Sequence, residues 1–190
     1  MVQIYCGDGK GKTTAATGLA LRAVGSGMPV LFGQFLKDTS STEILVMRGL
    51  KEISLFHAKK NYGFTWEMTE EEKLLQKEAN DELLLDVEKN LQDYLKDKNC
   101  EAGDIDNHTE KQSLRAVVVL DEVLHAVNNN LLSAEILYDF LDKYSGNNEI
   151  ILTGTNPSEK LVKRADYISE IKKIKHPFDK GIEARKGIEY

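Results

Sequence analysis

Short apolar runs alternate along the chain with longer segments in which apolar residues recur at helical spacing. Each run is bounded by glycine, proline or polar residues, as is typical of strands buried in a parallel sheet. The expected strands are residues 2–5, 30–34, 53–57, 116–121, 150–154 and 167–174. Because helical segments separate most of these runs, the pattern predicts an α/β domain with a mostly parallel central sheet of about six strands.

Two of the intervening helices have recognisable ends. One is expected to begin near Lys12 and to stop at Gly25 or Gly27, because helix formers fill the segment and glycine commonly follows a helix. A second is expected after Thr69, which has capping-box spacing to Glu72. Its apolar stripe consists of Leu75, Ala79, Leu83, Val87, Leu91 and Leu95. This stripe predicts a helix that covers one face of the sheet.

The segment 97–113 is polar and follows neither the helical nor the strand period. We interpret it as a surface loop, because it lies between the second helix and a strongly apolar strand. The chain has no internal repeat and no low-complexity tract. Residues 1–190 are therefore expected to form a single domain.

Composition limits the classes of function. The 190 residues are 41% hydrophobic and 29% charged, as expected for a globular domain. The 31 acidic and 25 basic residues give a formal net charge of −6, which offers no general attraction for DNA or RNA. Cys6 and Cys100 form no C-x-x-C motif, and no apolar run is long enough to span a bilayer. With no leader before the first strand, we expect a cytoplasmic protein without a nucleic-acid or membrane partner.

The stretch CGDGKGKTTAA at residues 6–16 follows the first predicted strand and leads into a predicted helix. The usual phosphate-binding loop, G-x-x-x-x-G-K-[ST], has a glycine where Cys6 stands. We therefore expect Cys6 to end the strand and the loop to start at Gly7. Gly7, Gly9 and Gly11 would let successive N–H groups point inward, and the helix that follows would add its positive end.

The loop also carries side chains suited to a nucleotide. Lys12 can reach a phosphate oxygen, Lys10 adds a second cation, and the Thr13 hydroxyl can bind Mg²⁺. A glycine-rich turn without a ligand is the alternative interpretation. We disfavour it because strand, loop, G-K-T and helix occur together in the required order.

The predicted strand in AVVVLDEV ends in Asp121 and Glu122. The carboxyl ends of parallel strands are where α/β sheets bind their ligands. A buried strand that merely ends in two acids is the alternative. Together with the loop, the pair predicts a second contribution to a Mg²⁺ site, which Mn²⁺ could also occupy, and either carboxylate could be the direct ligand.

Over most of its length the chain resembles the P-loop ATP:corrinoid adenosyltransferases of cobalamin biosynthesis. The similarity extends from GDGKGKTTAATGLALRAVGSG through GQFLK, YGFTWE and VVVLDEV to ILTGTNPSEKLVKRADYISEIKKIKHPFDKGIEARKGIEY. The GFTWE segment and the tail KHPFDKGIEARKGIEY are more specific than the phosphate loop. The family loop reads G-x-G-K-G-K-T-T and usually has threonine before it, so a glycine at position 6 is not required.

The resemblance implies a RecA-like domain with helices on both faces of the sheet, usually a homodimer, that binds ATP with Mg²⁺ and a corrinoid. Cobalt, reduced to Co(I) with electrons from a flavoprotein, would attack the 5′-carbon of ATP and release tripolyphosphate. The triphosphate would lie reversed in the loop, with Lys10 and Lys12 acting on the leaving group. The residues implied for ATP are Gly7, Asp8, Gly9, Lys10, Gly11, Lys12, Thr13, Thr14 and Arg22.

The family also implies roles for two aromatic residues. Phe64 and Trp66 would lie against the lower face of the corrin and displace the axial base from Co(II), which makes reduction to Co(I) easier. Without the family, two such aromatics are more often core packing or a loop anchor. Arg22 likewise has an ordinary alternative as an exposed helix residue.

Two other functions are compatible with the residues. One is a small-molecule kinase or ATPase, which the lack of a recognisable water-positioning or hydroxyl-positioning residue disfavours. The other is a corrinoid carrier that binds ATP without catalysing transfer. Many relatives have an N-terminal extension over the substrates, whereas here Met1 directly precedes the first strand, so how the site closes is left open.

Overall fold

In the computed structural model the residues described are 1–37, 41–63, 65–101 and 116–189, with the backbone alone for 98–101. Among them, strands β1 (Val2–Cys6), β2 (Val30–Gln34), β3 (Ile53–His57), β4 (Val117–Asp121), β5 (Glu149–Thr153) and β6 (Tyr167–Glu170) form one sheet. The strand order is β3-β2-β4-β5-β1-β6, and every pairing is parallel. The predicted α/β class is confirmed. Since all carboxyl ends meet at one edge, the glycine loop after β1 and the acids after β4 lie on the same edge, with β5 between them.

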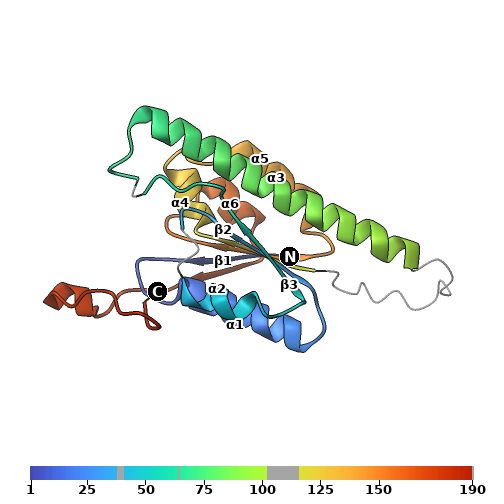
Figure 1. Cartoon of the computed structure of the whole chain (residues 1–190), viewed down its shortest axis with the longest axis horizontal. Helices are drawn as coiled ribbons and strands as arrows, with labels where there is room; N and C mark the ends of the chain where they lie inside the picture. The colour runs from blue at the N-terminus through green and yellow to red at the C-terminus, as the bar shows by residue number, and fades with distance from the viewer. Residues whose placement is uncertain (38–40, 64, 102–115, 190) are drawn as a thin grey trace.

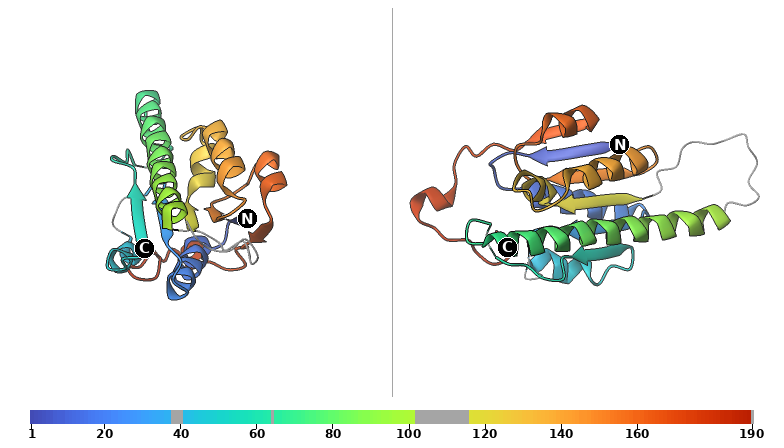
Figure 2. Two further views of the ribbon diagram at one scale, coloured as in Figure 1. Left: turned by 90° about the vertical axis from the view of Figure 1, so that its right-hand side faces the viewer. Right: turned by 90° about the horizontal axis from the view of Figure 1, so that it is seen from above.

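Helices cover both faces of this sheet (Figure 1). On one face lie α1 (Lys12–Gly25) and α2 (Thr42–Met47), and on the other lie α3 (Glu70–Glu101), α4 (Val123–Asn128), α5 (Ala134–Tyr144) and α6 (Glu159–Arg164). The end-on view in Figure 2 shows the three layers. A short 3₁₀ helix, η1 (Pro177–Lys180), lies in the C-terminal segment. Among the described residues, no helix combines the length and apolar character needed to cross a bilayer.

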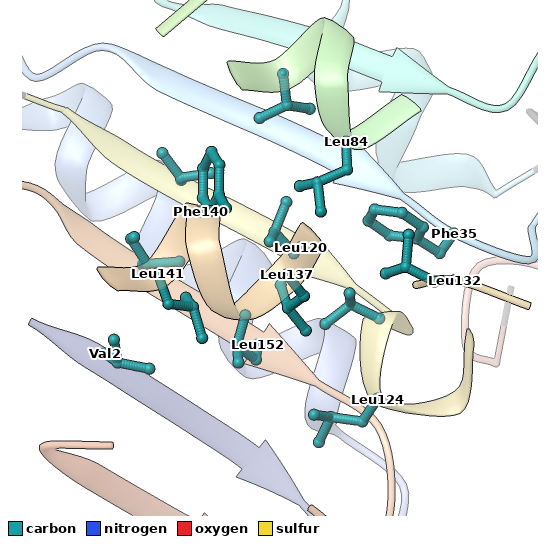
Figure 3. Close-up of a cluster of buried hydrophobic side chains, with 14 of the residues drawn as sticks. Val2, Phe35, Leu84, Leu120, Leu124, Leu132, Leu137, Phe140, Leu141 and Leu152 are labelled. Carbon is teal, nitrogen blue, oxygen red and sulfur yellow. The ribbon is translucent and has the colours of Figure 1, made fainter. Parts of the chain in front are cut away.

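Two apolar cores fix the sheet between its helices. In the larger one, Leu84 of α3 and Phe140 of α5 pack over Leu120 and Leu152 of the sheet (Figure 3). In the smaller one, α1 contributes only alanines to the buried cluster: Ala16, Ala20 and Ala23. Small side chains let a helix lie close to the sheet. The tight packing of α1 holds its first turn firmly at the sheet edge.

Predicted strand ends agree with the structure to within one residue except for β6, which was expected to reach Ile174 and ends at Glu170. The reason is that the backbone of Ile171 leaves the strand path. Its N–H donates to the carbonyl of Cys6 at 2.8 Å, and its carbonyl accepts from the N–H of Gly9 at 2.8 Å. The apolar residues after β6 continue the strand pattern although the chain has already crossed over the glycine loop.

The surface loop expected over 97–113 is wrong at its start, because α3 continues to Glu101. No glycine or proline occurs in this part of the helix, and Gly103 is the first such residue after it. Polar residues without a breaker can prolong a helix that is already formed, since each added residue gains a backbone hydrogen bond. The remainder of the expected loop, 102–113, lies outside the described residues.

Candidate active site

The glycine loop is held in place by the chain segment that follows β6. Gly7 has φ 111°, and a Cβ atom there would lie 2.3 Å from the carbonyl oxygen of Ile171. The N–H of Lys173 donates to the Asp8 carboxylate at 2.9 Å, and this hydrogen bond lowers the pKa of Asp8. Glycine is therefore required at position 7 because another backbone approaches closely, and Asp8 fastens that backbone to the loop.

This packing changes the expected use of the loop. The N–H of Gly9 donates to Ile171, so it does not join the inward-facing N–H groups expected over residues 7–14. The first turn of α1, which begins at Lys12 after Gly11 in the left-handed conformation, keeps N–H groups that no helical carbonyl accepts. Lys12 Nζ donates to the carbonyl of Gly9 at 2.9 Å and so spans the loop. The helix end and the lysines are therefore the groups of this loop whose chemistry suits an anion.

Asp121 lies at the centre of a hydrogen-bond network at the end of β4. Its side chain is fully buried. One carboxylate oxygen accepts from the hydroxyls of Thr13 at 2.9 Å and Thr153 at 2.7 Å. The other accepts from Lys37 Nζ at 2.8 Å and Gln34 Nε2 at 3.4 Å. The network joins the first turn of α1 to the ends of β2, β4 and β5, and it fixes the carboxylate in one orientation.

Lys37 belongs to this site, as do Gln34 and Thr153, although no motif in the sequence predicts a role for any of the three. Lys37 follows β2, the sheet neighbour of β4, and its Nζ also lies 3.0 Å from Thr13 Oγ1 and 3.9 Å from Glu122 Oε1. Burial acts to lower the pKa of Lys37, but the charge and hydrogen bond of Asp121 outweigh it and raise the pKa overall. The lysine is therefore a cation bound among acids. In the sequence, Lys37 is the lysine of GQFLK and follows the predicted strand 30–34. That strand is the neighbour of the strand that ends in Asp121.

Glu122 is oriented differently from Asp121. Its φ of 62° places it in the left-handed region, and its N–H donates to the Thr153 hydroxyl at 2.8 Å. Its carboxylate is hydrogen-bonded to Nδ1 of His125. Burial acts to raise the pKa of Glu122, but the hydrogen bond to His125 and the charge of Lys37 lower it overall. His125 thus has a partner and a structural role.

The residues present fit a magnesium ion. No group of three or more His, Cys, Asp and Glu that could hold a metal occurs among the described side chains. Magnesium rarely needs such a cage, because it binds one or two carboxylates and completes its shell with water and substrate phosphates. Thr13 and Asp121 provide such a partial set, and the ammonium of Lys37 between them shows that the position accepts a cation.

A cavity of about 950 Å³ opens beside the loop. Lys10, Thr13 and Thr14 line it on one side and Lys37 on another. Residues 187–189 of the C-terminal segment supply a further wall, and Figure 2 shows this segment returning to the body near α2. In this chain the tail therefore contributes to the closure of the site. Arg22 is exposed in the last turn of α1 and does not line this cavity, so the structure does not bring it to the loop.

A second cavity of about 500 Å³ lies between the start of α3 and the end of α4. Trp66 lines it and is 78% exposed, which contradicts the core-packing interpretation of this residue. Phe64, which was expected to act with it, lies outside the described residues. The segment between β3 and α3 contributes to both cavities: Asn61 and Gly63 line the first, and Thr65 and Trp66 line the second.

A buried polar chain anchors this shared segment. The N–H of Tyr62 donates to Gln76 at 3.1 Å, Gln76 donates to Asn80 at 3.2 Å, and Asn80 donates to the carbonyl of Leu131 at 2.7 Å. Gln76 and Asn80 are fully buried, whereas Leu75 of the predicted apolar stripe is 40% exposed. The first turns of α3 therefore face the protein with amides, and the apolar stripe is buried at Leu83, Val87 and Leu91.

The glycine loop after β1, the acidic strand β4 with β5 between it and β1, and the all-parallel order define an α/β P-loop domain. The solved structure of EssC (ATPases 2 and 3) from Geobacillus thermodenitrificans has the same fold, with a TM-score of 0.51 at 16% identity. The alignment covers 98% of this chain and 34% of that one, so the chain spans about a third of the matched protein.

Curated relatives are more informative. The chain is 32% identical to the corrinoid adenosyltransferase CobA of Salmonella typhimurium, over 100% of this chain and 85% of the relative. The Escherichia coli K12 corrinoid adenosyltransferase is 29% identical over 100% and 85%, and that of Pseudomonas aeruginosa is 28% identical over 98% and 82%. The family model for ATP:corrinoid adenosyltransferase BtuR/CobO/CobP matches residues 1–190. The chain belongs to this family.

Proposed function

We propose that this chain transfers the 5′-deoxyadenosyl group of ATP to the Co(I) centre of a corrinoid, either cobalamin or a precursor, and releases tripolyphosphate. Family membership gives the reaction class. The observation that supports the proposal most directly is that one connection lines both cavities: Asn61 and Gly63 line the cavity at the glycine loop, and Thr65 and Trp66 line the second. Substrates bound in the two cavities would meet at this connection, as transfer of a group between them requires.

In this reaction Co(I) donates an electron pair to the 5′-carbon and a Co–C bond forms. The C5′–O bond breaks, and its electrons remain on the leaving phosphate oxygen. Because cobalt is the nucleophile, no side chain has to remove a proton from water or from a hydroxyl group. The protein has to position the 5′-carbon and stabilise the growing charge on tripolyphosphate.

Lys10 and Lys12 are suited to the second task. Lys10 lines the larger cavity, and the contact between Lys12 Nζ and the Gly9 carbonyl can be exchanged for one to a phosphate oxygen. The first turn of α1 adds N–H donors and its positive end. We assign these groups to the triphosphate, with Asp8 holding the loop in shape from outside.

Thr13 and Asp121 are proposed to hold Mg²⁺, with Glu122 beside them and Mn²⁺ as a possible substitute. Lys37 Nζ lies 2.8 Å from Asp121 and 3.9 Å from Glu122, which favours Asp121 as the carboxylate nearer the cation. When bound, the divalent cation neutralises phosphate charge as the leaving group departs.

Trp66 and Phe64 are assigned to the lower face of the corrin. The exposure of Trp66 in the second cavity supports a ligand-contacting role over a packing role. With the axial base displaced by these aromatics, the orbital that accepts the electron falls in energy, and a flavoprotein reductant can then produce Co(I).

A homodimer and a cytoplasmic location complete the proposal. In the C-terminal segment, Ile174 is 86% exposed, Phe178 74% and Ile182 49%. Such apolar surface is available for a second subunit to cover. Sedimentation velocity of the purified chain would test the dimer directly.

One assay tests the proposed reaction. The protein is incubated with ATP, Mg²⁺ and pre-reduced cob(I)alamin, and the phosphate product is identified. Tripolyphosphate together with a Co–C product supports the proposal. ADP would indicate a kinase or ATPase instead, and binding without any phosphate product would indicate a corrinoid carrier.

A further inference from the structure

The ammonium group of Lys37 lies where a cation held by Thr13 and Asp121 would lie. Its Nζ is 3.0 Å from Thr13 Oγ1 and 2.8 Å from Asp121 Oδ2. The Thr13 hydroxyl donates its proton to the other oxygen of Asp121, so Lys37 uses a lone pair that a metal ion would need. The position of Lys37 Nζ is therefore one that a metal ion bound to Thr13 and Asp121 would also occupy.

The backbone directs Lys37 to this position. The N–H of Phe35 donates to the carbonyl of Asp121 at 2.9 Å, which ties the chain after β2 to the end of β4. Leu36 has φ 54°, a conformation that is unfavourable for a side chain of its kind and that turns the chain just before Lys37. Backbone strain of this kind persists where the surrounding structure requires the conformation. The placement of Lys37 is therefore set by the fold and is not a chance contact of a surface lysine.

We propose that Lys37 and the divalent cation are alternative occupants of this position, so that the metal enters only together with the triphosphate. The inference rests on the proposed Mg²⁺ site. Two cations that share Thr13 and Asp121 repel each other, so a metal ion on its own would have to move Lys37 away from Asp121 and leave it only the more distant Glu122, now 3.9 Å away, and solvent. A metal–triphosphate complex brings phosphate oxygens into the cavity that Lys37 also lines, and these can accept its hydrogen bonds.

The ammonium group then has two tasks in sequence. Before the substrate binds, it neutralises the buried charge of Asp121 and keeps the Thr13 hydroxyl in its metal-binding orientation. After exchange, its flexible four-carbon stem carries the positive charge to the triphosphate. Lys37 is in this sense a positioning residue for the metal that becomes a substrate contact.

The test measures binding of Mn²⁺ in the absence of nucleotide. Binding is monitored by electron paramagnetic resonance, in which the signal of the free ion decreases as the ion binds. In the wild type we expect weak binding of Mn²⁺ without nucleotide. Lys37→Met should increase this affinity at least about tenfold, and Lys37→Gln, which keeps a hydrogen-bond donor for Asp121, should do so as well. Lys10→Met is the matched control, because it removes a positive charge from the same cavity without touching Asp121, and it should change the affinity by less than about threefold. Adding Thr13→Val to Lys37→Met should abolish the gained binding.

A parallel titration with Mn²⁺ and ATP separates this inference from the proposed function. If the wild type fails to bind Mn²⁺ even with ATP, the proposed metal site is wrong and the inference fails with it. If the wild type binds Mn²⁺ with ATP but equally well without it, the inference alone is wrong. Equal gains in Mn²⁺ affinity in Lys37→Met and Lys10→Met would mean that the loss of any positive charge has this effect, and this result would also overturn the inference. Thermal unfolding of each variant identifies misfolding, and Lys37→Gln provides the answer if Lys37→Met does not fold.

Discussion

The two cavities differ in how firmly the side chains beside them are held. At the phosphate side, Asp121 is fully buried and accepts hydrogen bonds from Thr13, Thr153, Lys37 and Gln34. At the other side, Trp66 is 78% exposed and its neighbour Leu74 is 65% exposed. Charge developing on a leaving group is stabilised best by donors that are already oriented. A flat apolar ligand gains binding free energy instead by covering exposed aromatic surface. The side chains of the second cavity therefore do not need to be held as rigidly.

The largest effect is expected from Lys12→Ala, which tests the rigid side. The variant should lose the proposed charge-assisted contact to the leaving tripolyphosphate, worth about 2–4 kcal/mol. Transfer to pre-reduced Co(I) should fall about 30- to 1,000-fold in kcat/KM. Lys51→Ala, at a side chain that is 91% exposed, is the control and should be unaffected. Near-normal turnover by Lys12→Ala would mean that the loop lysine does not bind the leaving group.

Asp121→Asn should lower the free energy of unfolding by about 2–4 kcal/mol, because it leaves Lys37 without its buried counter-charge. The matched control is Asp142→Asn, which removes a charge from a surface pair with Arg164 and should cost far less. Urea unfolding of the two variants measures the difference. Similar losses in both would show that the Asp121 network is not the rigid element we describe.

Phe64→Ala/Trp66→Ala tests the exposed side by separating electron uptake from group transfer. Transfer to chemically pre-reduced Co(I) should remain largely intact. Starting from Co(II) with a flavin reductant, the rate should fall about 10- to 100-fold, since each 59 mV lost in a one-electron potential lowers the equilibrium amount of Co(I) about tenfold. Paired rates in the two regimes, with the Co(II) spectrum recorded for the four-coordinate species, make the measurement. Equal losses in both regimes would mean that the aromatics only hold the corrin or the fold.

A smaller effect is expected from Gln76→Leu. The variant leaves the N–H of Tyr62 without its acceptor and should destabilise the segment 61–66 by about 1–2 kcal/mol. The KM for the corrinoid should rise several-fold, while the KM for ATP changes little. Gln92→Leu, on an outer part of the same helix, is the control. A rise confined to ATP would place the segment on the nucleotide side alone.

The smallest effect is expected from Thr69→Ala, which removes the cap of α3 next to the second cavity and should cost about 1 kcal/mol. The N–H of Thr69 and then its hydroxyl lower the pKa of Glu72. The Glu72 carboxylate therefore stabilises the folded protein fully at pH values above the ordinary glutamate pKa. This stabilisation is lost as the pH falls through the lowered pKa of Glu72 in the folded state. Thermal unfolding should show a difference between wild type and variant that shrinks in acid. A difference that grows in acid would contradict this capping interaction.

Much of the fold could be predicted because its signals are local. Strands β2 and β3 were predicted at their observed ends, where apolar runs stop at polar residues, and the Thr69–Glu72 capping box is confirmed by its two reciprocal hydrogen bonds. The error at the end of β6 arose because a segment that is distant in the sequence determines the structure there. Ile171 continues the apolar pattern of β6, yet its backbone pairs with Gly9, and nothing near either residue in the sequence indicates this contact.

The candidate site divides in the same way. The loop, Thr13 and the acid pair follow from motif spacing, and the structure brings Thr13 and Asp121 together. Lys37 was missed because a single lysine after a strand has no motif, and only the sheet order places it beside Asp121. Gln76 and Asn80 were missed because a periodicity argument counts apolar positions and passes over buried amides that hydrogen-bond to each other.

The contact between Gly9 and Ile171 also has a consequence during protein synthesis. β1 leaves the ribosome well before its partners β5 and β6, whose residues are made much later. At about 5–20 residues per second, the first strand waits roughly 7 to 35 seconds for them. During this time Val2 and Ile4 have no sheet to cover them, and the glycine loop lacks the backbone that shapes it. The loop therefore takes its observed shape only after the segment around Ile171 has been made, and the N-terminal strand depends on strands from the other end of the chain for its cover.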